Sequence, residues 1–139
     1  MLLLLDSCKK EQKSSIALLT NGNYKDWTRY KQETDGMDTH LDSCFTDDLW
    51  RFFEDGRLQV DLKGTNCGWG VTGPVLYAHW YFNSTVDSIS WYVNEPNTNT
   101  YKIYSIGEEQ FVLARTQELV DSNGQWLGEQ NILDHFKKR

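Results

Sequence analysis

The stretch that decides the fold is residues 44–63, CFTDDLWRFFEDGRLQVDLK. It contains an aromatic-rich segment (48–53), a turn, and a segment in which apolar and polar residues alternate (57–63). The turn carries Asp55-Gly56, a strong hairpin signal because glycine adopts the positive φ that tight turns need. Strict alternation is typical of a strand that is buried on one face. The stretch therefore predicts an antiparallel β-hairpin.

Segments of the same kind recur along the chain. Strands are expected at residues 26–33, 75–83, 87–94, 100–106 and 110–117, separated by short turns rich in glycine, asparagine and aspartate. Residues 125–139 are ambiguous. A strand would form a hairpin across the turn Asp121-Ser122-Asn123-Gly124, whereas a helix would place Ile132, Leu133 and Phe136 on one face. The strand is favoured because Gly128 disfavours a helix.

This pattern predicts an all-β fold, an antiparallel up-and-down β-barrel of about eight strands. Closing the sheet removes its edges, and a barrel of about eight strands has room for side chains or for one small ligand. We expect one domain over residues 16–139.

Composition excludes some classes of function. The 139 residues carry a net charge of −6, and no basic stretch is interleaved with aromatic residues, which disfavours nucleic-acid binding. No apolar run approaches the roughly 20 residues that a transmembrane helix needs.

The N-terminus resembles the end of a bacterial lipoprotein signal peptide. An apolar run, MLLLL, leads to Cys8, with Leu5 and Ser7 at the positions of a lipobox and a polar stretch after the cysteine. Asp6 is unusual there, and the run is short for a signal. We expect residues 1–15 to be a truncated lipoprotein signal and tether, with Cys8 as the lipidated residue. The alternative is a frayed apolar terminus.

The other two cysteines then form a pair. An exported protein can oxidise Cys44 and Cys67, and the disulfide would enclose the hairpin. A loop of this size is worth about 3 kcal/mol in the chain-entropy model. The spacing does not suit zinc, and a catalytic cysteine has no support from neighbouring residues.

At this point the chain resembles the small lipocalin-like lipoproteins of Bacteroidota. Their plan is a lipobox cysteine, a strand opening with tryptophan, a cysteine-flanked Asp-Gly hairpin and later aromatic strands. The matching residues are Cys8, Trp27, Cys44, Asp47, Asp48, Trp50, Phe52, Asp55, Gly56, Cys67, Trp80, Ile89, Tyr101 and Phe111. The resemblance implies a barrel that is extracytoplasmic and attached to the cell envelope, in the periplasm or at the outer membrane, usually without a known ligand.

Apolar residues on alternating positions should converge on the barrel interior. They are Leu58, Val60, Trp80, Phe82, Ile89, Trp91, Ile103, Phe111 and Leu113. They either fill the core or line a cavity for a small hydrophobic ligand. The opposite face of one strand carries Tyr77, His79 and Tyr81.

We predict no catalytic residues, no metal site and no cofactor. Asp47 and Asp48 point to opposite faces of a strand, and the three histidines are far apart in sequence. The favoured function is a non-enzymatic lipoprotein that holds a small hydrophobic ligand or none, with the membrane contacted through the lipid alone. The alternative is a protein-interaction or inhibitor module that uses the barrel exterior and loops, with an unknown partner. A small barrel enzyme is a third hypothesis.

Overall fold

A computed structural model describes residues 13–63 and 73–139. The fold is 59% strand and 8% helix. The strands are β1 (Tyr24–Thr34), β2 (Met37–Thr39), β3 (Leu49–Phe53), β4 (Arg57–Asp61), β5 (Val75–Phe82), β6 (Ser88–Tyr92), β7 (Thr98–Ile106), β8 (Gln110–Val120) and β9 (Trp126–Lys138). Two short helices, α1 (Ser15–Thr20) and α2 (Ser43–Thr46), complete the elements. Cys8 and Cys67 lie outside the described residues, so the lipidated cysteine and the Cys44–Cys67 disulfide stay predictions.

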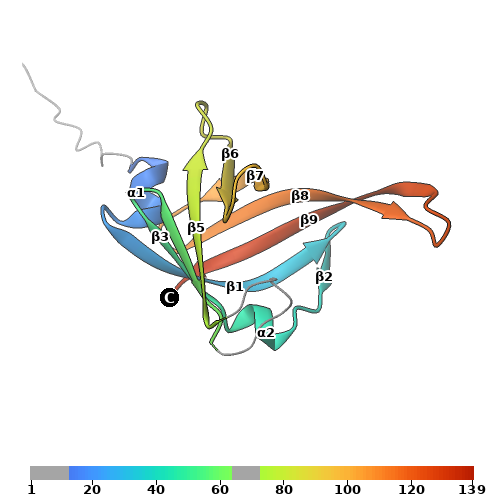
Figure 1. The fold of residues 1–139 in the computed structure, drawn as a ribbon, viewed down its shortest axis with the longest axis horizontal. Helices are drawn as coiled ribbons and strands as arrows, with labels where there is room; N and C mark the ends of the chain where they lie inside the picture. Colours follow the sequence, from blue (N-terminus) through green and yellow to red (C-terminus); the bar gives the residue numbers. More distant parts are fainter. Residues whose placement is uncertain (1–12, 64–72) are drawn as a thin grey trace, which may run out of the picture.

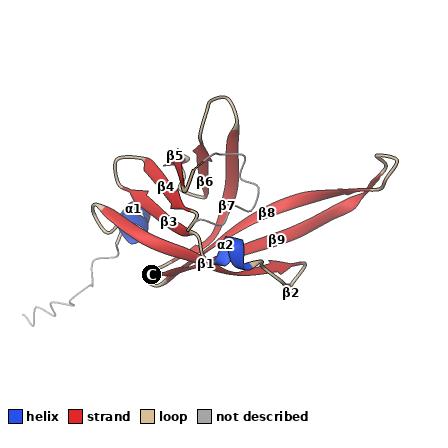
Figure 2. Ribbon diagram, turned by 60° about the horizontal axis from the view of Figure 1, so that its bottom comes forward, coloured by secondary structure: helices blue, strands red, loops and turns tan. Residues whose placement is uncertain are grey.

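The strands form one antiparallel sheet that closes into a barrel (Figures 1 and 2). Seven of its strands, β3 to β9, follow one another in chain order, and β1 completes the ring of eight by pairing with both β3 and β9. The extra strand, β2, pairs with the end of β1 only. The predicted lipocalin-like, up-and-down barrel is confirmed.

Strand β1 makes this closure possible because it serves two neighbours. Its first part pairs with β3 from Tyr24 to Trp27, and its longer second part pairs with β9 up to Thr34. The register shifts between Arg29 and Lys31, and such a bulge bends a strand and increases its twist. One strand can therefore lie along both edges of the sheet.

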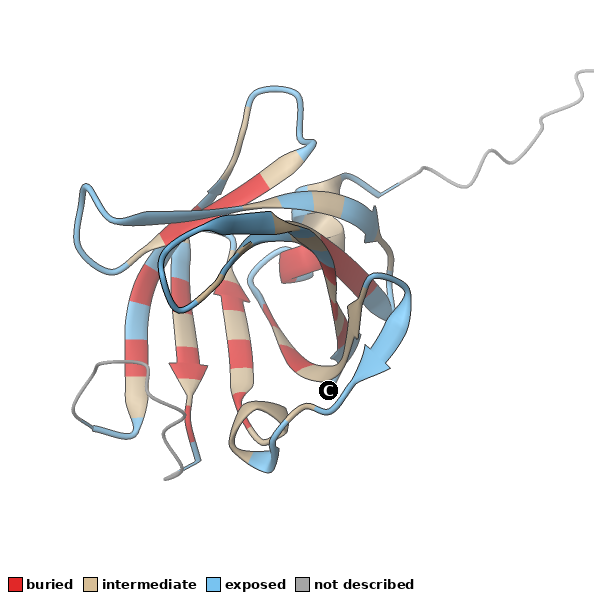
Figure 3. Ribbon diagram, turned by 90° about the vertical axis from the view of Figure 1, so that its right-hand side faces the viewer, coloured by how far each residue is buried: buried red, intermediate tan, exposed pale blue. Residues whose placement is uncertain are grey.

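The core lies inside the barrel and is dominated by aromatic rings. Along β3, β4 and β5, buried positions alternate with more exposed ones, and such bands are visible in Figure 3. Trp27 stands edge-on to Phe111 at 4.7 Å between ring centroids, and Phe111 stacks on Phe136 at 4.4 Å. Trp50 contacts Phe136 and Trp91, both at 5.4 Å.

Helix α1 covers one end of the barrel, which we call the α1 end. The indole N–H of Trp27 donates a buried hydrogen bond of 3.0 Å to the carbonyl of Leu19. The ammonium of Lys25 donates to the carbonyls of Leu18 and Glu108 at 2.9 and 2.7 Å, which ties the helix to the β7–β8 turn. Burial lowers the pKa of Lys25, and the nearby Glu108 opposes this effect. Helix α2 lies at the opposite end, the α2 end (Figure 1).

The β8–β9 hairpin extends beyond the barrel as an arm (Figure 1). The two strands pair from Gln110↔Lys137 as far as Val120↔Trp126, but β7 pairs with β8 only up to Ala114 and β1 pairs with β9 only from Ile132. The segments 117–120 and 126–130 therefore pair only with each other. We call them the arm.

The structure corrects several predicted elements. Residues 15–20, which were not predicted to be helical, form α1, and the Oγ of Ser14 caps it by accepting a 3.2 Å hydrogen bond from the amide of Ala17. Strand β2 was not predicted, because its three residues are all exposed and carry no alternating pattern. Residues 126–138 form a strand, so the preferred interpretation of the C-terminal segment is correct and the helical alternative is wrong.

We predict that Phe111→Ala lowers the free energy of unfolding by about 3–5 kcal/mol. Phe111 is 1% exposed and touches Trp27, Phe52 and Phe136, so truncation leaves a cavity where the two ends of the sheet meet. Urea unfolding measures the loss. The control, Tyr77→Ala, removes a ring that is 65% exposed and should cost about 1 kcal/mol or less. Equal losses in the two variants would contradict the assigned core.

Candidate functional site

All nine residues predicted to face the interior do so. Seven belong to the buried cluster, and Phe82 and Ile103 are partly buried and pack against it. The register explains this arrangement, since Trp80 lies opposite Trp91, Phe82 opposite Ile89, and Ile103 opposite Leu113. The predicted ligand-binding set is thus one contiguous apolar surface inside the barrel.

Sequence analysis left four aromatic residues of the buried cluster out of that set. Trp27, Trp50, Phe52 and Phe136 are each 2% exposed or less and join the same cluster. Strand β3 is apolar on both faces, so alternation alone could not decide which of its residues point inward. Its outward Phe53 lies under Tyr24, at 5.7 Å between ring centroids, and under the guanidinium of Arg57.

A charged cluster interrupts the apolar interior toward the α2 end. Asp134 of β9 is 3% exposed, and its carboxylate is shared by three side chains. The Gln32 amide donates to Oδ1 at 2.8 Å, Arg115 Nε donates to Oδ2 at 3.2 Å, and Arg29 Nη1 lies 3.5 Å from Oδ1. We call Arg29, Gln32, Arg115 and Asp134 the Asp134 cluster.

The Asp134 cluster is buried to different depths. The side chain of Arg29 is 12% exposed, whereas that of Arg115 is 32% exposed. Burial lowers the pKa of Arg29, and the charge of Asp134 works against that shift. Since an arginine remains protonated at physiological pH, both guanidinium groups are cations. Asp134 pairs with both of them, and the buried Asp48 also acts electrostatically on Arg29.

Aromatic rings flank this cluster on two sides. The ring of Phe45, in α2, lies 4.8 Å from the guanidinium carbon of Arg29. Tyr101 stacks on Trp91 at 4.4 Å between centroids and interacts electrostatically with Arg29, Arg115 and Asp134. Burial raises the pKa of Tyr101, so its hydroxyl keeps its proton and can donate a hydrogen bond. The α2 end therefore offers a ring pair beside cationic groups.

One donor in the cluster has no acceptor within the described part of the chain. The Nε–H of Arg29 is buried and makes no hydrogen bond with residues 13–63 or 73–139. A buried donor without an acceptor costs about 1–3 kcal/mol, and such atoms in native proteins call for an explanation. The buried Asp48 acts electrostatically on Arg29 and also has a separate interaction.

None of the four cluster residues was predicted. The available signal in the sequence was Asp134. Ile132, Asp134 and Phe136 occupy alternate, inward positions of β9, and Asp134 is the only charged residue of the three. A charged residue at an inward position predicts a partner inside the barrel. The signal was hidden because the C-terminal segment could also be a helix, in which Ile132 and Phe136 share one face and Asp134 lies on another.

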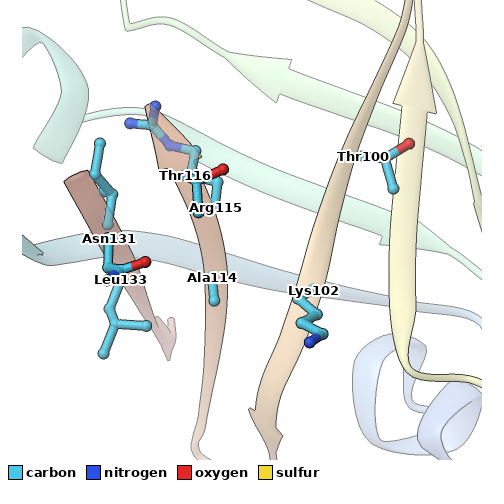
Figure 4. Close-up of a pocket in the computed structure, with 8 residues that line it drawn as sticks. Thr100, Lys102, Ala114, Arg115, Thr116, Asn131 and Leu133 are labelled. Atoms are coloured by element: carbon cyan, nitrogen blue, oxygen red, sulfur yellow. The ribbon is translucent and has the colours of Figure 1, made fainter. Parts of the chain in front are cut away.

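A hollow lies at the base of the arm. It encloses about 440 Å³ and is lined by Thr100, Lys102, Ala114, Arg115, Thr116, Asn131, Ile132 and Leu133. Figure 4 shows Lys102 and Arg115 projecting in different directions from neighbouring strands. Lys102 pairs with Ala114, one position before Arg115, so alternation places the two side chains on opposite faces. Arg115 therefore lines the hollow and also belongs to the Asp134 cluster, whereas Lys102 lines the hollow only.

The three histidines do not come together. His40 is exposed beside Asp42, and His79 stacks on Tyr92 on the outside of the barrel. His135 Nε2 lies 3.2 Å from Glu33 Oε2, on different strands from His79. Within residues 13–63 and 73–139, no three metal-binding side chains are grouped to hold an ion.

Comparison with known proteins brings no identification: no family model matches the sequence, and no curated protein is significantly similar to it. Among the described residues, no helix is long and apolar enough to cross a membrane.

We predict that Asp134→Asn lowers the free energy of unfolding by about 3 kcal/mol, because it leaves the buried Arg29 without its charged partner. Urea unfolding at neutral pH measures the change. The control, Glu118→Gln, lies on the arm opposite Glu129 and should be neutral or slightly stabilising, since it removes a like-charge pair. If the two variants are equally stable, the Asp134 cluster is not the buried network described above.

Proposed function

We propose that the protein is a non-enzymatic binding module that holds a small hydrophobic molecule at the α2 end of the barrel. One observation supports the proposal above others. The apolar interior ends in the stacked pair Trp91 and Tyr101, directly beside the polar Asp134 cluster. An apolar surface with a few convergent polar groups is the usual composition of a small-molecule site.

Access favours the α2 end over the α1 end. At the α1 end, helix α1 is fixed by hydrogen bonds from Trp27 and Lys25. At the α2 end, the exposure of the charged side chains increases from Asp134 to Arg29 to Arg115. These three side chains therefore lead from the interior to solvent. A ligand would bind with its apolar part against the rings and its polar part toward the arginines.

The proposed setting is the cell envelope. The lipobox-like sequence before Cys8 and the even number of remaining cysteines support an extracytoplasmic lipoprotein, tethered through a lipid on Cys8 and oxidised at Cys44 and Cys67. A lipid tether would keep the barrel near a source of hydrophobic molecules.

We predict that N-phenyl-1-naphthylamine, an uncharged fluorescent probe, quenches tryptophan emission saturably and raises the melting temperature by several degrees. At a ligand concentration of about 100 Kd, mass action adds about 2.7 kcal/mol of stability. Fluorescence titration and thermal melting measure the two effects. Quenching should persist in Trp126→Phe, which removes an exposed indole on the arm. A melting temperature that does not change with probe concentration would contradict the proposal.

A second candidate function, protein interaction, is favoured by the arm. Its tip exposes three apolar side chains, Val120, Trp126 and Leu127, each about 60% accessible. Exposed tryptophans are enriched in interaction hot spots, and no packing requirement within the barrel accounts for these three. Glu118, Asp121 and Glu129 each lie within two residues of one of them in the sequence, so the arm fits a protein with an apolar pocket and a basic rim.

We predict that a photo-crosslinking residue at position 127, introduced in the native cells, gives one discrete protein adduct. The adduct should disappear when Trp126→Ser is added, since the indole would be the anchor. The control places the same residue at position 77, on the exposed outer face of β5. Identical adducts from both positions, or an adduct that survives Trp126→Ser, would exclude the arm as the interaction surface.

A further inference from the structure

We propose that the ligand of the α2 end is an amphipathic carboxylate, whose acid group binds the guanidinium groups of Arg115 and Arg29. This inference rests on the proposed function and names the chemical class of the ligand. It depends on three observations about the Asp134 cluster. The cluster has more hydrogen-bond donors than Asp134 accepts from, its side chains differ in solvent exposure, and aromatic rings lie beside it.

The cluster has more donors than its carboxylate can use. Each guanidinium carries five N–H groups, yet Arg115 gives one hydrogen bond to Asp134, and Arg29 approaches the same carboxylate at 3.5 Å through Nη1. Oδ1 already accepts from Gln32. The buried Nε–H of Arg29 has no acceptor in the described part of the chain. One more oxyanion would satisfy donors that Asp134 leaves over.

The position of Arg115 selects a ligand that reaches the cluster from solvent. Its side chain is about a third exposed, while Asp134 behind it is almost fully buried. A planar guanidinium binds a carboxylate through two parallel N–H bonds, which makes it selective for this group over an alcohol or an amide. Arg115 is therefore the first cation that an incoming acid group would contact.

The rest of the ligand is predicted from what lies beside the arginines. Trp91 is 6% exposed and stacks on Tyr101, and both lie on strands whose inward faces are apolar. Tyr101 also lies close enough to Arg29, Arg115 and Asp134 to interact with them electrostatically. An aliphatic or aromatic body can pack against this pair while the carboxylate stays at the cluster.

The test compares decanoate with decanol, which have the same chain and differ in charge. Isothermal titration at pH 8 should show that wild-type protein binds decanoate about tenfold or more tightly than decanol, as expected for a charge-assisted hydrogen bond in a partly desolvated site. Arg115→Gln should abolish this preference. The matched control, Lys102→Gln, removes the same charge one strand away on the opposite face of the sheet and should retain it.

The possible results separate the inference from the proposed function. Equal affinity of wild-type protein for the acid and the alcohol overturns the carboxylate inference and leaves a hydrophobic site in place. Binding of neither compound overturns both. A preference that survives Arg115→Gln, or that is lost in Lys102→Gln, shows that the acid group does not bind the Asp134 cluster.

A second measurement uses wild-type protein alone, in case Arg115→Gln does not fold. Decanoate labelled with carbon-13 at its carboxyl group is titrated with acid while bound. The bound carboxyl would meet the guanidinium groups of Arg29 and Arg115, while the carboxylates of Asp134 and Asp48 act on the same cluster from behind them. Direct hydrogen bonds from the two guanidinium groups to the ionised acid should make it titrate at a lower pH than the free acid. Titration at the same pH as the free acid would overturn the inference.

Discussion

The pairing of β1 with β9 turns an open sheet into a closed barrel, and the interior exists only because of it. The pairing needs the bulge between Arg29 and Lys31, which lets one strand bend from β3 onto β9. It also brings Phe136 of the last strand against the interior rings of Trp50 and Phe111. A contact between the first and last strands has high sequence separation, so its entropic cost is recovered only by the aromatic core that it encloses.

The same pairing assembles the charged cluster. Arg29 and Gln32 come from β1, and Asp134 comes from β9, so the ion pair forms only when the barrel closes. A buried carboxylate shared by two arginines contributes little net stability, and its desolvation cost can exceed its attraction. The barrel is therefore stabilised by its rings more than by this cluster.

Much of the barrel could be predicted from alternation and turn residues. Leu58 and Val60 alternate with polar neighbours, and Asp55-Gly56 marks the turn between β3 and β4. What could not be predicted depends on tertiary context. Strand β2 carries no pattern of its own, and helix α1 is held by the reach of Lys25 and Trp27 from another element. The length of the arm was also missed, because its pairing continues past the last buried residues.

The site was harder to predict because its residues have no common sequence motif. The apolar interior set was predicted correctly in position, since it follows from alternation alone. The Asp134 cluster joins residues 29, 32, 115 and 134, which only barrel closure brings together.

The most direct test of a ligand at the α2 end is nitrogen-15 NMR of the tryptophan indole N–H groups during addition of decanol. We expect the Trp91 signal to shift saturably while that of Trp126 on the arm stays in place. A shift of Trp126 alone, or of no indole, would contradict the account.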